Sequence, residues 1–374
     1  MIPFNFPYVP QSSKEYVLQS LENRHQEGDG PFTKKASKMI SNLVGGGHVL
    51  LTPSCTHALE MASMLANLGP GDEVILPAYT FTSAATAVTK FGATPVFVDI
   101  ELETKGINLQ QAREAITPRT KAISWVNYAG VAPDIRGLQN LAREFNLLLI
   151  EDNAHGLGGT FEGKPLGSFG DFATQSFHAS KNIQCGEGGA LVINNFKFVE
   201  RAEVIREKGT DRSKFIRGEV QKYQWVDNGS SYLLAESLAA ILLGQLESFE
   251  EIQKRRQTLF STYEAALASW SKKFDFELQA SLAFEKNIAH MFYLIANSKT
   301  TRDKVITQLL DSGIQAMFHY QSLASSKKGR MYKSGREEFE VSERMSNQLF
   351  RLPLFFDLSD RSQERIIESV TNSM

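Results

Sequence analysis

Short apolar runs alternate with stretches of helical spacing over much of this 374-residue chain. Five runs are expected strands: His48–Thr52, Glu73–Leu76, Pro95–Asp99, Lys121–Val126 and Leu147–Asp152. Between them, apolar residues recur every three or four positions, which predicts helices near residues 56–68, 84–91, 108–116 and 135–145. Apolar strands that alternate with helices are typical of a largely parallel sheet covered on both faces. This part of the chain is therefore predicted to be an α/β domain.

Other patterns precede and follow this region. The first 30 residues are rich in proline and then glycine, which predicts an irregular arm with a short helix near residues 14–24. After Leu234 the pattern indicates long helices, from residue 237 to 260 and onward, then a smaller mixed unit with strands near 289–294 and 315–318. We place the domain boundary near residue 245. This gives a large domain with the arm (1–245) and a small C-terminal domain (246–374).

Composition excludes several classes of protein. The 40 basic and 42 acidic residues give a formal net charge of -2, so no overall field attracts nucleic acid or an anionic membrane. No segment reaches the roughly 20 apolar residues of a membrane helix. The two cysteines are too few for a disulfide framework and lack metal-ligand spacing, which indicates a reducing compartment. We expect a cytoplasmic enzyme without a metal, whose partners are small molecules and itself.

The segment from Ser176 to Gly189 holds a lysine, Lys181, between an apolar approach and a glycine-rich turn. A desolvated amine beside a cationic cofactor has a lowered pKa, so it can attack an aldehyde and later act as a base. Lys181 is therefore a candidate Schiff-base lysine. Taken alone, the segment is more typical of a surface lysine beside a loop of glycines.

Polar residues follow several predicted strands, where ligand sites lie in parallel sheets. Ser54 and Thr56 begin a helix, where they either cap it or help its free amides bind a phosphate. Phe81 either covers a planar ring or packs in the core. Asp152 could pair with a protonated ring nitrogen or cap a helix, and His155 could reach a ring substituent or be a lone core histidine. A metal site of these two would lack a third ligand with matching spacing.

Five stretches occur in the order and spacing of the DegT/DnrJ/EryC1/StrS sugar aminotransferases, and the sequence resembles that family over nearly its whole length. They are Ser54–Leu59, Pro77–Phe81, Glu151–His155, Ser176–Lys181 and Gly186–Gly189. The resemblance implies the fold type I of enzymes that depend on pyridoxal 5'-phosphate (PLP). That fold has a large domain with a mostly parallel seven-stranded sheet, a smaller C-terminal α/β domain, and active sites at the interface of a homodimer.

The resemblance also implies roles for individual residues. Lys181 would bind PLP covalently and move the proton between cofactor and substrate carbons. Asp152 would pair with the pyridinium nitrogen, His155 would lie near the ring hydroxyl, and Phe81 would stack on the ring. The phosphate would be held by Ser176, Thr56 and the backbone of His57, and the substrate would contact Tyr79 and His319.

Further stretches resemble the branch of the family that aminates dTDP-4-keto-6-deoxy-D-glucose: among them are Met1–Asn5, Gly28–Thr33, Tyr128–Val131, Gly229–Tyr232, His290–Tyr293 and Phe318–Tyr320. This resemblance implies that L-glutamate is the amino donor and that the product is dTDP-4-amino-4,6-dideoxy-D-galactose, for a surface polysaccharide such as lipopolysaccharide or enterobacterial common antigen. The gluco epimer or a 3-amino sugar is the alternative product.

The sequence departs from the family at three places. Leu233 occupies a position where many members have an asparagine that reaches the partner's phosphate, and Ser230 or Ser231 could substitute for it. Asn127 stands where close relatives often have histidine, and the chain after Tyr320 lacks the usual proline and histidine.

Two other classes of function fit the sequence less well. A nicotinamide-dependent sugar oxidoreductase would need a glycine-rich turn after an early strand, whereas Gly45–Gly47 precedes its strand. A protein of this fold that had lost catalysis would be expected to lack Lys181.

Overall fold

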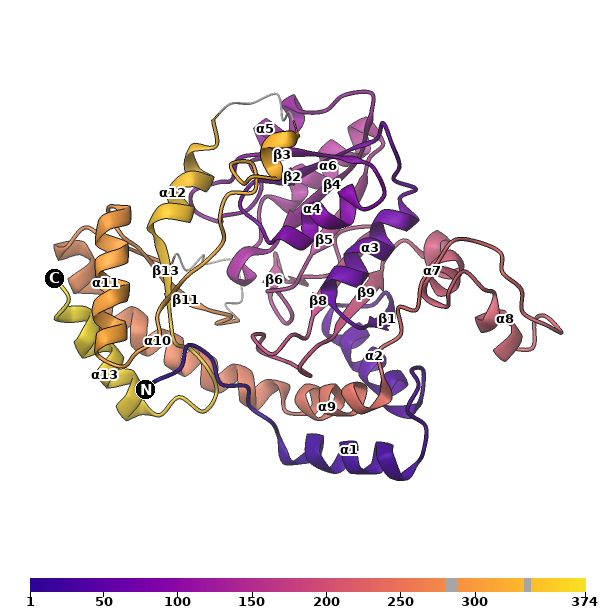
Figure 1. The fold of residues 1–374 in the computed structure, drawn as a ribbon, viewed down its shortest axis with the longest axis horizontal. Coiled ribbons are helices and arrows are strands. Elements are labelled where there is room, and N and C mark those ends of the chain that lie inside the picture. The colour runs from indigo at the N-terminus through magenta and orange to yellow at the C-terminus, as the bar shows by residue number, and fades with distance from the viewer. Residues whose placement is uncertain (280–287, 333–337) are drawn as a thin grey trace.

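The structure is a computed structural model that describes residues 1–279, 288–332 and 338–374 (Figure 1). A seven-stranded sheet forms the centre of the large domain. Its strands are β1 (His48–Thr52), β2 (Glu73–Pro77), β3 (Thr94–Val98), β4 (Thr120–Val126), β5 (Leu148–Asp152), β8 (Phe172–Ser176) and β9 (Gly189–Ile193). They are ordered β1-β9-β8-β5-β4-β2-β3, and β9 runs antiparallel to both of its neighbours while the other pairs are parallel. The expected mostly parallel seven-stranded sheet is confirmed.

Helices cover both faces of this sheet because successive strand residues point to opposite sides. One face packs against α3 (Cys55–Leu65), α4 (Thr82–Thr89) and α7 (Val199–Arg206). The other face packs against α2 (Pro31–Leu43), α5 (Leu109–Glu114), α6 (Ile135–Phe145) and α9 (Glu236–Glu247). In β2, for example, Val74 and Leu76 contribute to the first core and Ile75 to the second.

Two stretches add detail to the expected elements. The long helices expected from residue 237 onward are α9 and α10 (Phe249–Lys273), which meet at Ser248. The break allows Phe249 to pack closely over Gly158 in the large domain. Helix α2 lies in a region where no helix was expected, although Pro31 occupies its first turn, a position that proline favours.

The small domain is built on a second, antiparallel sheet. Its strands are ordered β10 (Glu277–Leu278), β11 (Phe292–Ile295), β13 (Leu349–Leu352) and β12 (Met317–Phe318). This sheet packs against α10, α11 (Lys299–Asp311) and α13 (Asp360–Thr371). Phe249 and Ile252 of α10 belong to a core of the large domain, whereas the helix from Leu259 onward belongs to the core of the small domain. The boundary near residue 245 stays a prediction.

The remaining elements are short or peripheral. They are α1 (Gln11–Glu22), α8 (Arg212–Ile216), α12 (Glu340–Gln348), the hairpin β6 (Thr160–Phe161) and β7 (Lys164–Pro165), and the 3-10 turns η1 (Tyr128–Gly130), η2 (Phe196–Phe198) and η3 (Gly329–Met331). Across the described ranges, no helix combines the length and apolar character needed to cross a membrane.

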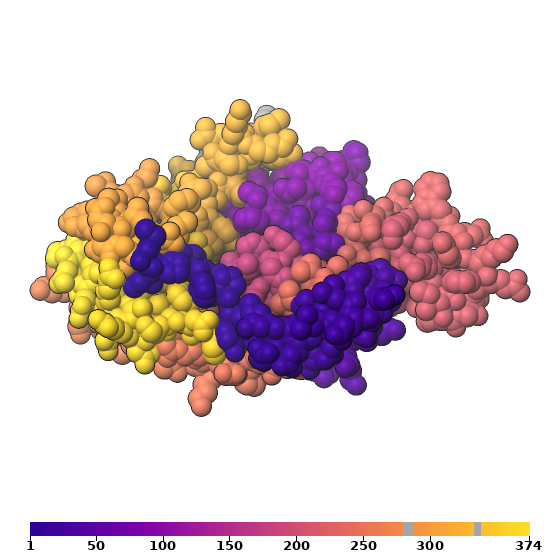
Figure 2. Space-filling view, turned by 60° about the horizontal axis from the view of Figure 1, so that its bottom comes forward, coloured from indigo at the N-terminus to yellow at the C-terminus, as the bar shows by residue number. Residues whose placement is uncertain are grey.

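The N-terminal arm, residues 1–10, lies across both domains (Figure 2). Ile2 pairs with the small domain, where its amide donates to Gly313 O at 2.7 Å and its carbonyl accepts from Gln315 N at 3.0 Å. Tyr8 stacks on Phe356 with ring centroids 4.0 Å apart, and α1 then packs along α9 of the large domain. The arm therefore connects the two domains along the surface of the chain.

A segment of residues 207–231, the projecting segment, extends from the large domain beyond α7 (Figure 1). It contains α8, and its ends are joined by a bridge between Glu207 and Ser231. Apolar side chains along it are open to solvent, and Trp225 is 77% exposed. Such an extension offers little core of its own and a large apolar surface.

Candidate active site

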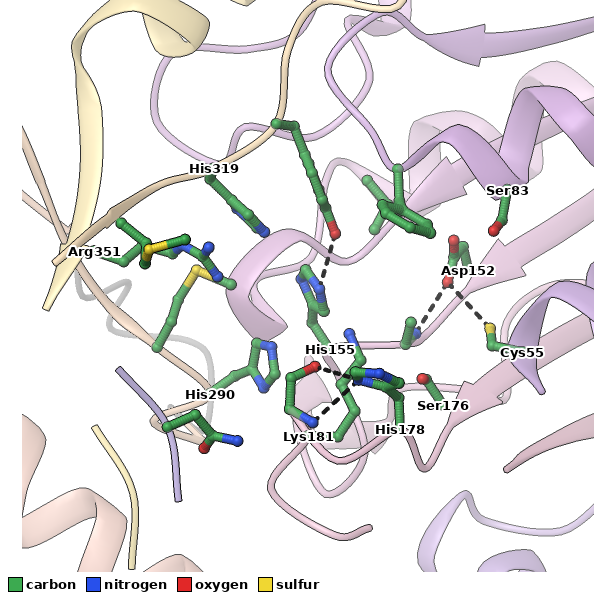
Figure 3. Close-up of a pocket in the computed structure, with 18 of the residues that line it drawn as sticks. Cys55, Ser83, Asp152, His155, Ser176, His178, Lys181, His290, His319 and Arg351 are labelled. Carbon is green, nitrogen blue, oxygen red and sulfur yellow. Dashed lines mark hydrogen bonds between the residues drawn. The ribbon is translucent and has the colours of Figure 1, made fainter. Parts of the chain in front are cut away.

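A cavity of about 640 Å³ opens where β5 and β8 end, between the large sheet and the small domain (Figure 3). Its wall includes the predicted residues Thr56, Phe81, Asp152, His155, Ser176, Lys181 and His319. The small domain and the N-terminal arm complete the wall. The carboxyl ends of parallel strands thus meet a second domain at one hollow, which is the usual place for a ligand in this architecture.

Lys181 lies in the loop between β8 and β9, which backbone hydrogen bonds hold closed. Phe177 N donates to Gly188 O at 2.8 Å, and Ala179 N donates to Gly186 O at 2.8 Å. Gly186 has a φ of 83°, a left-handed conformation that favours glycine at this turn. The glycines therefore fold the loop back on itself and present the lysine to the cavity.

The electrostatic surroundings of Lys181 favour its neutral amine. Burial lowers the pKa of Lys181 to about 8, and the charge of Arg351 acts in the same direction. The nearby Cys55 and Asp152 oppose the shift. An amine with this pKa is a nucleophile and a base near neutral pH, which an ordinary surface lysine is not.

Asp152 ends β5 and is buried at the cavity wall, only 5% exposed. Its Oδ1 accepts a hydrogen bond from Ala154 N at 3.0 Å, and the Cys55 thiol lies 4.0 Å from the same oxygen. Burial raises the pKa of this carboxyl, while the Ala154 amide and the charge of Lys181 lower it. The environment gives the carboxylate few donors of its own, so a cationic ligand group at the cavity would be its natural partner.

His155 is buried beneath the cavity and both of its ring nitrogens are engaged. Nδ1 accepts from Ala129 N at 3.3 Å, and Nε2 lies 3.1 Å from the Tyr320 hydroxyl. The ring stacks on His290 with centroids 4.3 Å apart. Burial and the charges of Lys181 and Arg351 hold the pKa of His155 well below its usual value, so the ring is neutral. The structure brings no group of three or more His, Cys, Asp or Glu into a metal-binding arrangement within the residues it describes.

Comparison with known proteins identifies the family. The model of the DegT/DnrJ/EryC1/StrS aminotransferase family matches residues 8–371 of the chain. The chain belongs to this family. An uncharacterized protein of Methanocaldococcus jannaschii is 30% identical over 378 residues, which cover 97% of this chain and 96% of that protein.

Solved structures with similar sequences have the same fold. A proposed sugar aminotransferase of Streptococcus pneumoniae in its PMP form superposes with a TM-score of 0.91 at 26% identity, over 100% of this chain and 99% of the other. DesI, determined in the presence of its TDP-sugar product, superposes with a TM-score of 0.88 at 25% identity, over 98% of this chain and 91% of the other. The protein is thus a PLP-dependent sugar aminotransferase with the expected fold.

The site residues of this aminotransferase fit PLP at the ring nitrogen and the aldehyde. The buried Asp152 carboxylate suits a protonated pyridine nitrogen, and the Lys181 amine suits the aldehyde. Phe81, at the start of α4, is 54% exposed and lines the cavity, so its ring is free to cover a planar cofactor. These three residues would hold the ring of the cofactor.

The N-terminus of α3 offers a place for the phosphate. Thr56 Oγ1 lies 2.7 Å from Ser83 Oγ, and Ser176 ends β8 on the same wall. The His57 amide, however, donates to Ser54 Oγ at 3.2 Å, so Ser54 caps the helix and takes the amide that was expected to bind the phosphate. The His57 ring packs against Tyr232 outside the cavity. Ser83 is an additional hydroxyl that sequence reasoning did not identify.

Tyr79 does not reach the cavity wall. It is fully buried beneath it, between Tyr128 and Tyr320, with ring centroids 5.4 and 5.7 Å away. His319 does line the cavity, and its Nδ1 lies 2.7 Å from the Tyr128 hydroxyl. Tyr79 would therefore support the aromatic wall from behind, whereas His319 faces the space left for a substrate.

Several cavity residues were not identified as candidates from the sequence. Tyr320 and His290 belong to stretches that carry the resemblance, so a signal for them was present. Arg351 lies in the apolar strand β13, and the one signal for it is a charge within an apolar run. Phe4 and Asn5 belong to another of those stretches, Met1–Asn5, but hydrophobic periodicity alone gives no sign that the N-terminal arm contacts the site.

Proposed function

We propose that this aminotransferase transfers the amino group of L-glutamate to C4 of dTDP-4-keto-6-deoxy-D-glucose, giving dTDP-4-amino-4,6-dideoxy-D-galactose. The observation that carries the proposal is the cavity, at which Lys181 and Asp152 meet the stretches that resemble the 4-keto-6-deoxyhexose branch. Residues from three of those stretches line its wall: Phe4, Asn5, His290, Met291, Phe318, His319 and Tyr320. The structural similarity to DesI, which has a TDP-sugar product, supports a nucleotide sugar as the substrate.

The residues of this chain divide the chemistry between them. PLP, when bound, supplies an electron-withdrawing ring that stabilises negative charge on the substrate carbon. Asp152 would keep the ring nitrogen protonated by accepting its hydrogen bond. Lys181, with its pKa lowered to about 8, would remove the proton from the donor carbon and later deliver a proton to C4 of the sugar. Thr56, Ser83 and Ser176 would hold the phosphate so that the ring cannot drift from Lys181.

The proposal includes a homodimer with each active site completed at the interface. The projecting segment supports it, because Trp225, Ile216 and Val226 are 77%, 67% and 56% exposed in the single chain. Apolar side chains gathered on one extension are typical of an interaction surface. We place the reaction in the cytoplasm and its product in surface polysaccharide synthesis.

The proposal is tested by incubating the purified protein with PLP, L-glutamate and dTDP-4-keto-6-deoxy-D-glucose and resolving the amino sugar by NMR. An axial 4-amino group is expected from the unchanged protein and none from Lys181→Ala. An equatorial amine would show that the product is the gluco epimer instead. Amination of a 3-keto isomer alone would contradict the proposed substrate while leaving the family unchanged.

A further inference from the structure

Arg351 is a half-buried cation at the cavity wall, and no acidic side chain among the described residues pairs with it. It projects from β13, and its Nη2 donates to Phe318 O at 3.0 Å. Its Nε is enclosed and has no acceptor, and among the residues the structure describes no carboxylate forms an ion pair with it. A guanidinium has five N–H donors, so most of its hydrogen-bonding capacity is unused by the protein.

Burial of such a charge is unfavourable unless a partner compensates it. The pKa of Arg351 is lowered by burial, and the groups that oppose this shift are the phenols of Tyr128, Tyr320 and Tyr79, which are neutral at physiological pH. An uncompensated charge in a cavity costs stability, and such costs gather at functional sites. A ligand with an anionic group would supply the missing partner.

The ring of Phe4 holds the guanidinium in place. The Arg351 Cζ lies 4.6 Å from the centroid of this ring, which comes from the N-terminal arm. The arm is itself fixed nearby, because Phe4 N donates to Gln315 Oε1 at 3.2 Å and Asn5 Nδ2 donates to Ala179 O at 2.9 Å. Phe4 is therefore a positioning residue for Arg351, and the arm gains a role in the site.

The position of Arg351 in the cavity indicates which ligand it meets. Figure 3 shows Arg351 and Asp152 on opposite sides of the hollow, with His155 between them. Asp152 would pair with the ring nitrogen of the cofactor, so the cofactor would occupy the part of the cavity next to Asp152. The part next to Arg351 would then hold the substrate. The acidic residues that line the cavity are Asp152 and Glu187, and Glu187 lies 3.7 Å from His178 in an ion-pair arrangement. No acidic group of the wall therefore competes for Arg351 within the described residues.

We propose that Arg351, carried on the ring of Phe4, binds a carboxylate group of the amino-acid donor. This inference rests on the proposed function, in which an amino acid and a nucleotide sugar use one cavity in turn. The planar fork of arginine matches a carboxylate and forms two parallel hydrogen bonds with it. The donor would be held by Arg351 while its amino group reaches Lys181, and the keto acid would leave when that contact breaks. The diphosphate of the nucleotide sugar is the other anion that could meet this arginine.

The two half-reactions separate these ligands. L-Glutamate is mixed with the PLP-loaded enzyme, and the loss of the PLP absorption gives the dissociation constant of L-glutamate and the rate of the first half-reaction. The nucleotide sugar is mixed with the PMP-loaded enzyme, and the return of that absorption gives the same two quantities for the sugar. For Arg351→Gln we expect the dissociation constant of L-glutamate to rise about tenfold to hundredfold, because hydrogen bonds to charged groups are lost. The sugar half-reaction is expected to keep its dissociation constant.

Two further variants and a binding measurement sharpen the test. Arg351→Lys keeps the positive charge but loses the planar guanidinium that forms two parallel hydrogen bonds. We expect it to raise the dissociation constant of L-glutamate less than Arg351→Gln does. Phe4→Leu keeps an apolar side chain without the aromatic face, and we expect glutamate binding to weaken about twofold to fivefold. Calorimetry with glutarate, a dicarboxylate without an amino group, reports the same site without turnover. Arg365→Gln is the matched control, since Arg365 is an exposed arginine of α13 that donates to Ser312 O.

The outcomes distinguish this inference from the proposed function. Unchanged binding of L-glutamate and glutarate in Arg351→Gln, with normal PLP content and melting temperature, would overturn it. A defect confined to the nucleotide-sugar half-reaction would also overturn it and assign Arg351 to the diphosphate. If the unchanged protein aminates no sugar, the proposed function fails, whereas glutarate binding still decides the role of Arg351.

Discussion

The hydroxyl of Tyr320 accepts a hydrogen bond from Nε2 of His155, 3.1 Å away. The direction follows from the other ring nitrogen, because Nδ1 faces the backbone amide of Ala129 and an amide can only donate. The neutral ring must then carry its proton on Nε2. Tyr320 consequently keeps its own proton for another partner, and its side chain lines the cavity. We infer that this hydroxyl donates to the cofactor or the substrate.

Replacement of Tyr320 by phenylalanine should slow the half-reaction with L-glutamate by about tenfold, since one hydrogen bond at the reacting groups is lost. PLP should still bind at Lys181 and show its absorption. Stopped-flow absorbance measures both. Tyr16→Phe is the control, because the Tyr16 hydroxyl contacts Glu247 on the surface. A rate equal to that of the control would assign Tyr320 a packing role alone.

The rate at which cofactor-free protein captures PLP should rise with pH through a midpoint of about 8. The reactive form of Lys181 is the neutral amine, and burial lowers the pKa of Lys181 to about 8. Its neutral fraction therefore grows as the pH passes this value. Reconstitution followed by absorbance over a pH series gives the midpoint. A midpoint near 10.5, the usual pKa of lysine, would contradict the conclusion that burial lowers the pKa of Lys181.

Acid should destabilise the cofactor-free protein below about pH 6.5, the unperturbed histidine value. Burial holds the pKa of His155 and of His290 well below the usual value. Between the folded and unfolded pKa values, the unfolded chain binds more protons, so the free energy of unfolding falls as the pH falls. The loss is at most about 1.4 kcal/mol per pH unit for each histidine. Urea unfolding over this range measures it.

His290→Gln provides the comparison for that measurement. Its unfolding free energy should decline less steeply with acid, because one of the three cavity histidines whose pKa burial holds well below the usual value, His155, His290 and His319, is gone. His178→Gln, at an exposed position near the cavity, should leave the slope as it is. Equal slopes in the unchanged protein and His290→Gln would assign the acid sensitivity to other groups.

Trp225→Ser should weaken self-association, because Trp225 is the most exposed large apolar side chain of the projecting segment. We expect sedimentation velocity to show dissociation at higher protein concentration than for the unchanged protein. Phe196→Ser is the matched control, since Phe196 is 68% exposed but lies in η2, outside that segment. An identical effect of both changes would show that general surface apolarity, and not this segment, holds the subunits together.

The hydrophobic pattern predicted the large sheet well because its strands are local and apolar on both faces. The strand at His48–Thr52 and the helix at residues 135–145 match the structure at both ends. The pattern after residue 237 predicted long helices but not the position at which α9 and α10 meet, Ser248, next to which Phe249 packs against Gly158, distant in sequence. Tertiary contacts of this kind leave no periodic signal.

The candidate site was predictable where chemistry and local geometry coincide. Asp152 ends β5 and Lys181 follows β8, so the fold brings them to one edge of the sheet. Arg351 and Phe4 come from opposite ends of the chain, and the pairing of Ile2 with the small domain sets their contact. No spacing rule connects residues so far apart. The resemblance alone predicted a use for the His57 amide that the Ser54 cap competes with.

The attachment of the N-terminal arm has a practical consequence for anyone who expresses this protein. Phe4, which supports Arg351, is three residues from Met1, and Ile2 is held in a β-bridge with Ile314. A purification tag fused before Met1 would begin next to that bridge and three residues from Phe4, which lines the cavity. The other end of the chain follows α13, on the outer side of the small domain (Figure 1). Tags and immobilisation linkers belong there, and kinetic constants from N-terminally tagged protein should be checked after cleavage.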